Sequence, residues 1–213
     1  MQDIIIVCAG STAHEVYGVL ENINEHEQEQ GRPPKYNVLG FIDDNPNAVL
    51  EDYVDAKIIG NISDWQPIGD EVYALGNSQP ETKEKLAALL ESRGCRFETI
   101  IGPYSRVKPH VKIGRGCFIT AYCINNGAVI GDFVNIQGSM IGGHTQMGDF
   151  STALGFANIP NAKVGTRALI GSQAVILGHS VGDDATVCAG SVVVGNVKPG
   201  TKVFGNPAKK VNF

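Results

Sequence analysis

An aliphatic or methionine residue followed by glycine recurs every 17 residues through the second half of this chain of 213 residues. The five pairs are Ile113-Gly114, Ile130-Gly131, Met147-Gly148, Val164-Gly165 and Val181-Gly182. Further aliphatic positions divide each step into three runs of about five or six residues. A fixed period of this kind indicates a solenoid, whose coils bury their inward side chains only by stacking on their neighbours. We expect three short strands per coil, and glycine at a corner because its backbone adopts angles that a side chain forbids.

The first half of the chain has a different pattern. Apolar runs at residues 3–8, 38–42 and 71–75 predict buried strands, and helices are expected after the first run and over residues 82–93. Alternating strands and helices predict an α/β domain with a parallel sheet, which binds ligands at the carboxyl ends of its strands. The residues at those ends are Gly10, Ser11, Thr12, Asp43, Asp44, Gly76 and Asn77. The dinucleotide pattern G-x-G-x-x-G is absent there, which argues against NAD.

Charge divides the chain at the same place. Residues 1–100 carry 18 acidic and 7 basic side chains, whereas residues 101–213 carry 4 acidic and 10 basic ones. The basic half is expected to attract a polyanionic ligand such as a phosphorylated cofactor. We therefore predict two domains, 1–100 and 101–213.

Composition also argues against several classes of protein. The net charge of −5 disfavours nucleic-acid binding, and no apolar run is long enough for a membrane span. The start of the chain lacks the basic segment of a signal peptide, so a cytoplasmic protein is expected. The five cysteines are never spaced as C-x-x-C, which predicts neither a disulfide framework nor a zinc site.

The coil repeats look like the hexapeptide repeat of left-handed parallel β-helix acyltransferases. Together with residues 41–44 (FIDD), 74–77 (ALGN) and the closing segment 205–209 (GNPAK), they make the whole chain resemble the bacterial nucleotide-sugar and sialic acid acetyltransferase family. The resemblance implies a Rossmann-like N-terminal domain that holds a nucleotide-sugar and a left-handed β-helix that binds acetyl-CoA between the subunits of a homotrimer. It implies N-acetylation of a nucleotide-linked amino sugar for a bacterial surface polysaccharide.

The resemblance also implies a histidine base on one corner of a middle coil, followed by an acidic residue. His144 lies in that coil and has the same phase in the repeat as His110, whereas His179 is one residue out of phase. An alignment without a gap puts Gly143 at the histidine position and His144 at the acidic one, so the register stays open. Asp149 or Asn126 is the expected partner that polarises the imidazole.

Further residues follow from the same resemblance. Small residues near the thioester, Ser172 and Gly190, match positions whose backbone amides stabilise the oxyanion. Pro207 belongs to the closing segment, and Lys209 and Lys210, with Lys198 and Lys202, are expected to face the phosphates of CoA. In the first turn of the N-terminal domain, Thr12 stands where the family has a histidine, while His14 opens the helix either as a nucleotide contact or as a surface residue.

Three other functions stay open. The first is O-acetylation of a sugar such as sialic acid. The second is a non-catalytic scaffold that binds sugars. The third is a metal enzyme, because some left-handed β-helices resemble γ-type carbonic anhydrases. His144 and His179 are spaced for such a site, but the third histidine is missing.

Overall fold

The structure is a computed structural model of the chain, and residues 1–212 are described. They form two compact units. One unit comprises Met1–Ser78 with Thr82–Pro103, and the other comprises Gln79–Glu81 with the residues from Tyr104 onward.

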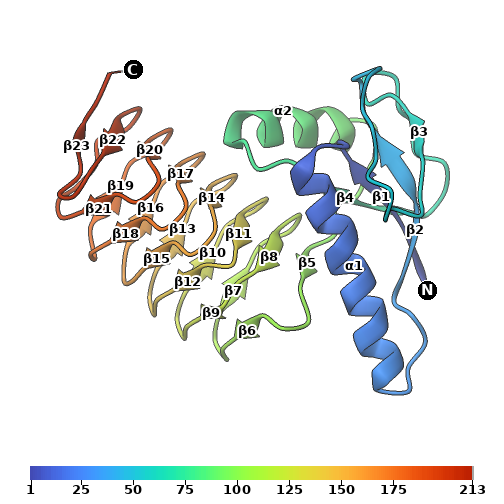
Figure 1. Cartoon of the computed structure of the whole chain (residues 1–213), viewed down its shortest axis with the longest axis horizontal. Coiled ribbons are helices and arrows are strands. Elements are labelled where there is room, and N and C mark those ends of the chain that lie inside the picture. Colours follow the sequence, from blue (N-terminus) through green and yellow to red (C-terminus); the bar gives the residue numbers. More distant parts are fainter. Residues whose placement is uncertain (213) are drawn as a thin grey trace. The chain divides into compact units, whose positions relative to one another are not determined.

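The first unit contains a parallel sheet of four strands in the order β3-β2-β1-β4 (Figure 1). The strands are β1 (Gln2–Val7), β2 (Tyr36–Ile42), β3 (Ile58–Gly60) and β4 (Val72–Leu75), and β5 (Ile100–Ile101) ends the unit. β1 lies between β2 and β4, and its last four residues are fully buried. The predicted strands are thus present and parallel. The short strand β3 was not predicted.

Two helices belong to the described chain, α1 (Ser11–Glu29) and α2 (Pro80–Glu91). α1 begins directly after Gly10 and buries Val16, Leu20 and Ile23, the face that the apolar spacing predicts. α2 starts and ends two residues earlier than expected. Proline is favoured in the first turn of a helix, and Gly94, at φ +89°, lies just beyond its end.

The second unit is a parallel β-solenoid, as the repeat predicts (Figure 1). Each coil contributes one short strand to each of three sheets. The first sheet, called the groove sheet below, contains β7 (Lys112–Ile113), β10 (Val129–Ile130), β13 (Gln146–Met147), β16 (Lys163–Val164) and β19 (Ser180–Val181). The second contains β6 (Arg106–Val107), β9 (Cys123–Ile124), β12 (Met140–Ile141), β15 (Asn158–Ile159), β18 (Val175–Ile176) and β21 (Val192–Val193).

The third sheet includes β8 (Phe118–Thr120), β11 (Asn135–Gln137), β14 (Thr152–Ala153), β17 (Leu169–Ile170), β20 (Thr186–Val187), β22 (Lys202–Phe204) and β23 (Lys209–Lys210). The pairing is parallel except between β22 and β23. In the groove sheet the pairing follows the 17-residue step, with Ile130 beside Met147 and Met147 beside Val164. Three columns of inward aliphatic side chains fill the interior of the solenoid.

The expected reason for the repeating glycines is wrong. The glycine after each inward aliphatic residue does not have a positive φ. A Cβ added at Gly148 would instead lie 2.6 Å from the backbone nitrogen of Thr166, one coil further on. Glycine is therefore required there because adjacent coils approach too closely for any side chain.

The left-handed backbone region is occupied at other corner positions, and mostly by residues other than glycine. In the corner before the groove sheet these residues are His110, Gly127, His144, Asn161 and Gly178. In the corner after it, Phe133 and Phe150 adopt the same conformation, and their rings stack with centroids 5.1 Å apart. An L-residue in this region costs about 1–2 kcal/mol, so the surrounding hydrogen bonds must stabilise each corner.

Neither helix of residues 1–212 has the combination of length and apolar character that crossing a bilayer requires.

The close approach at Gly148 can be tested by substitution. Gly148→Ala should lower the free energy of unfolding by about 1–3 kcal/mol because its methyl group would overlap the backbone of the next coil. Gly155→Ala is the control, since no atom lies within 4 Å of its added Cβ, and it should change stability by less than about 0.5 kcal/mol. Urea unfolding followed by circular dichroism measures both. Equal effects would show that coil spacing is not the reason for the repeating glycine.

Candidate active site

His144 lies at the apex of the corner between β12 and β13. Its backbone has φ +60°, and its amide donates a hydrogen bond to the carbonyl oxygen of Asn126, 3.3 Å away in the preceding coil. The side chain is exposed. His110 has the same conformation two coils earlier, at φ +64°, as the phase of the repeat predicts.

The imidazole of His144 lies against the preceding coil. A Cβ added at Gly127 would be 2.7 Å from Nδ1 and 2.9 Å from Cε1 of this ring. The two residues before His144, Gly142 and Gly143, also lack side chains. The ring therefore stands on a corner with little side-chain cover, where an imidazole can exchange a proton with a bound molecule.

Of the two residues expected as partners of His144, only one lies next to it in the structure. Asn126 is next to it through the backbone hydrogen bond, but Asp149 follows β13 at the other end of that strand. Oδ1 of Asp149 accepts a hydrogen bond from the amide of Asp132 at 2.8 Å. Asp183 makes the same kind of bond to Thr166, at 2.9 Å. Asp149 thus belongs to a series of corner residues that link adjacent coils. Gly143 contributes only its backbone to this corner, so the imidazole there belongs to His144.

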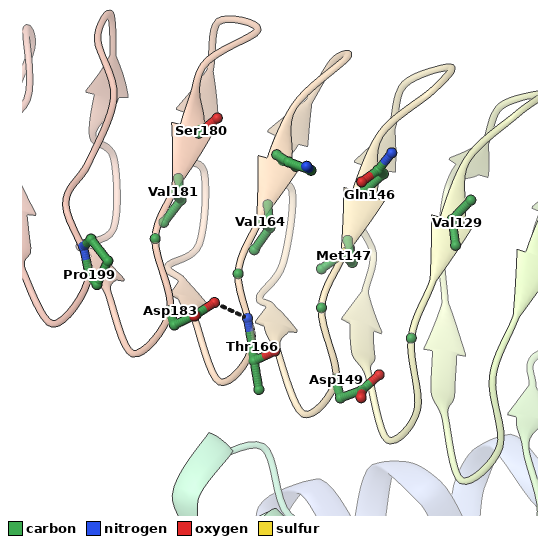
Figure 2. Close-up of a pocket in the computed structure, with 15 residues that line it drawn as sticks. Val129, Gln146, Met147, Asp149, Val164, Thr166, Ser180, Val181, Asp183 and Pro199 are labelled. Atoms are coloured by element: carbon green, nitrogen blue, oxygen red, sulfur yellow. Dashed lines mark hydrogen bonds between the residues drawn. The ribbon is translucent and has the colours of Figure 1, made fainter.

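A shallow groove of about 570 Å³ runs along the outside of the groove sheet and across its next corner (Figure 2). The outward side chains along it are Val129, Gln146, Lys163 and Ser180. Figure 2 shows Asp149 and Asp183 at the corner, with the hydrogen bond from Thr166 to Asp183. The groove crosses several coils, so it suits an extended molecule.

The residues predicted to bind the cofactor lie in two places. Ser172 and Gly190 are neighbours on adjacent coils, but the Gly190 amide already donates to the Ser172 carbonyl at 2.9 Å. This bond occupies the amide that was expected to stabilise an oxyanion. The other place is the end of the solenoid, where Lys209 and Lys210 form β23 after a cis peptide bond to Pro207.

Two of the C-terminal lysines share a cavity. Lys198 and Lys210, both exposed, line a space of about 430 Å³ together with apolar residues including Val193, Val203 and Ala208. The arrangement places two positive charges beside an apolar wall, which suits a ligand with anionic and apolar parts. Lys209 is exposed but does not line this cavity.

In the first unit, the carboxyl ends of β1, β2 and β4 meet as predicted. The Ala9 amide donates to Oδ2 of Asp43 at 2.7 Å, and the Gly76 amide donates to the carbonyl oxygen of Val7 at 2.9 Å. Asn77 Nδ2 lies 3.8 Å from the sulfur of Cys8. Asp43 and Asn77 therefore flank the turn that leads into α1, the place where parallel sheets bind ligands.

The remaining predicted residues of this turn have different environments. Gly10 is exposed at the N-terminus of α1, Ser11 is exposed and Thr12 is buried. Oδ1 of Asp44 accepts a hydrogen bond from the Ser63 amide at 2.8 Å, so this side chain holds another loop.

Cys8 was not predicted as part of the site. It adopts φ +74°, and burial raises the pKa of its thiol to about 11. The thiol therefore stays neutral at physiological pH, and Cys8 is not a thiolate nucleophile. No sequence pattern predicts a cysteine with a positive φ. The Cys8 amide donates to the Ile42 carbonyl of β2 at 2.8 Å, and this bond and those of its neighbours to Asp43 and Gly76 stabilise the strained turn.

His14 lies further along α1. Its ring packs edge-on against Phe41 and Tyr53, with centroids 6.3 and 6.4 Å away, and its Nε2 is buried without a hydrogen-bond partner among the described residues. The ring of His14 is thus partly buried between two aromatic side chains, and His14 is not a fully exposed surface residue.

No group of three or more His, Cys, Asp or Glu side chains that could hold a metal ion occurs within residues 1–212.

Comparison with known proteins agrees with this geometry. Residues 161–194 match the family model "Hexapeptide repeat of succinyl-transferase". The match covers two coils of the solenoid, from the corner before β16 to the end of β21. Serine acetyltransferase 4 of Arabidopsis thaliana is 37% identical over 113 residues, which are 50% of this chain and 29% of that protein. The chain thus spans less than a third of the length of this curated relative.

Solved structures match both units of the chain. The acetyltransferase domain of PglB from Neisseria gonorrhoeae FA1090 has a TM-score of 0.84 at 20% identity, covering 99% of this chain and 100% of that one. PerB from Caulobacter crescentus, in complex with CoA and GDP-perosamine, has a TM-score of 0.82 at 20% identity, covering 100% and 98%. These likenesses show a common fold.

The contacts of Asp43 can be tested by truncation. Asp43→Ala should lower the free energy of unfolding by about 1.5–3 kcal/mol, because the carboxylate accepts hydrogen bonds from the amides of Ala9 and Asn45, both at 2.7 Å. The exposed Asp64 lies outside this turn, and Asp64→Ala serves as the control. Thermal unfolding compares the two. If both variants melt at the wild-type temperature, Asp43 does not stabilise the turn.

Proposed function

We propose that the protein is an acetyl-CoA-dependent N-acetyltransferase that acts on a nucleotide-linked amino sugar in bacterial surface polysaccharide biosynthesis. The observation that carries this proposal is the exposed His144 at the apex of a solenoid corner, in a fold shared with PerB, whose structure contains CoA and GDP-perosamine. The hexapeptide match and the serine acetyltransferase relative support acyl transfer in general.

In the proposed reaction, the amine of the sugar attacks the carbonyl carbon of the acetyl thioester. His144 accepts the proton that the nitrogen loses as the carbon–nitrogen bond forms. The carbon–sulfur bond of the tetrahedral intermediate then breaks, and the CoA thiolate leaves. The imidazolium returns its proton to this thiolate, which restores neutral His144 and yields CoA and the acetamido sugar.

The nucleotide-sugar is assigned to the first unit, which we propose is Rossmann-like. The backbone amides of Ser11 and Thr12 suit a phosphate group, since the first amides of a helix have no carbonyl partner within it. The next two amides, of Ala13 and His14, donate to the Gly10 carbonyl at 2.9 and 3.1 Å. Gly10 leaves this end open, and Asn77 supplies a side-chain amide from the neighbouring strand end. Asp43, which holds the turn, supports the placement of these amides.

Acetyl-CoA is assigned to the solenoid. The anionic part of CoA suits the cavity with Lys198 and Lys210, and the pantetheine arm suits an elongated surface such as the outer groove. Ser172, Gly190, Pro207 and Lys209 remain proposed contacts. We further propose that the β-helix is left-handed and that the protein is a cytoplasmic homotrimer. Residues 1–100 are the proposed nucleotide-sugar domain, and residues 101–213 are the proposed acetyl-CoA domain.

The reaction can be tested directly. Release of CoA thiol from acetyl-CoA should depend on an amino sugar linked to GDP, UDP or dTDP, and the matching hydroxyl sugar should not replace it. His144→Asn should lower kcat by about 10²–10⁴-fold because it removes the base. His110→Asn, at the same corner position two coils away, is the control and should retain wild-type kcat. An unaltered kcat in His144→Asn would exclude His144 as the base, and turnover of only the hydroxyl sugars would indicate O-acetylation.

The cofactor assignment has a separate test. The double variant Lys198→Ala/Lys210→Ala should raise KM for acetyl-CoA about tenfold or more, because charge-assisted contacts contribute about 1.5–3 kcal/mol each. The effect should shrink as salt is added. Lys85→Ala, an exposed lysine of α2, is the control. A KM that stays at the wild-type value at low salt would rule out this cavity for the phosphates.

A further inference from the structure

We propose that Gly127 is a positioning residue, which fixes the orientation of the His144 imidazole so that Nε2 faces the reactants. This inference rests on the function proposed above, because it gives the ring its role there. The contact itself is a property of the free protein and can be measured without turnover.

Gly127 and His144 are in close contact. With Gly127 lacking a side chain, the Nδ1–Cε1 edge of the His144 ring occupies the space that a Cβ would take, at 2.7 and 2.9 Å from that position. Contacts below 3.0 Å are essentially never made by real Cβ atoms, so the ring and a side chain at residue 127 exclude each other. Of the two ring nitrogens, Nδ1 faces the coil and Nε2 is the one left for a bound molecule.

The backbone of His144 has little freedom to respond to a side chain at residue 127. The residue sits at φ +60° in a tight corner, and its amide is bound to the Asn126 carbonyl, next to Gly127. A methyl group at residue 127 therefore forces the ring to rotate about its side-chain bonds. A displacement of about 1 Å at a reacting group can cost about 10²-fold in rate.

The same corner contains a matched control. Gly178 also has a left-handed backbone, at φ +68° compared with +76° for Gly127. A Cβ added there would meet nothing closer than the Asn161 carbonyl oxygen at 3.9 Å. Alanine at either position carries the cost of the left-handed backbone, about 1–2 kcal/mol, but only alanine at residue 127 meets an imidazole.

The experiment compares Gly127→Ala with Gly178→Ala. In the free protein, proton NMR observes the Hε1 resonance of His144, which is assigned by its absence in His144→Asn. This resonance should shift in Gly127→Ala and keep its wild-type position in Gly178→Ala. In the acetyl-transfer assay, Gly127→Ala should lower kcat about 10²-fold with KM for acetyl-CoA within twofold, whereas Gly178→Ala should keep kcat. Adding Gly127→Ala to His144→Asn should cause no further loss of kcat.

Each result decides the inference. An unshifted His144 resonance in Gly127→Ala overturns it, and so does an unchanged kcat. If the wild-type protein acetylates no acceptor, the proposed function fails, but the resonance still tests whether Gly127 orients the ring. If Gly127→Ala does not fold, Gly127→Ala/His144→Ala is made. If this double variant folds, removal of the ring has relieved the overlap, which supports the inference. If it does not fold while Gly178→Ala does, the inference is overturned.

Discussion

Stacking of coils at the spacing of hydrogen-bonded parallel strands, about 4.8 Å, is the constraint on which the solenoid depends. At this spacing the residue after each inward aliphatic side chain, such as Gly148, lies too close to the next coil to carry a Cβ. The same stacking aligns Ile130, Met147 and Val164 in one buried column. Glycine at these positions and an aliphatic residue before them are therefore two consequences of one spacing, and they recur with the 17-residue step of the coil.

The candidate active site follows from the corners that this register creates. In the corner before β13 the left-handed position is occupied by His144, whose imidazole is exposed. The neighbouring coil affects the site because Gly127 leaves the space into which the ring fits. At the other end of β13, Asp149 is engaged in holding coils together. The proposed base and this structural carboxylate thus lie at opposite ends of one strand.

The first unit places its polar residues by a different route. Parallel strands end at one edge, which brings Asp43 beside the turn after β1 and Asn77 beside the Cys8 sulfur. Burial keeps the Cys8 thiol neutral by raising its pKa to about 11, so this edge offers hydrogen-bond donors and acceptors but no cysteine thiolate from Cys8. Such an edge is suited to binding, and the proton acceptor of the proposed reaction comes from the solenoid.

The period of the aliphatic and glycine residues was sufficient to predict the parallel solenoid, its three strands per coil and the shared phase of His110 and His144, because these depend only on spacing along the chain. The alternation in the first half likewise predicted which strand ends meet. The true reason for the repeating glycines, the hydrogen bond that engages Asp149 with the preceding coil and the contact of His144 with Gly127 came only from the tertiary structure. Each depends on distances between atoms of different coils, and periodicity shows which coils are neighbours without showing how closely their atoms approach.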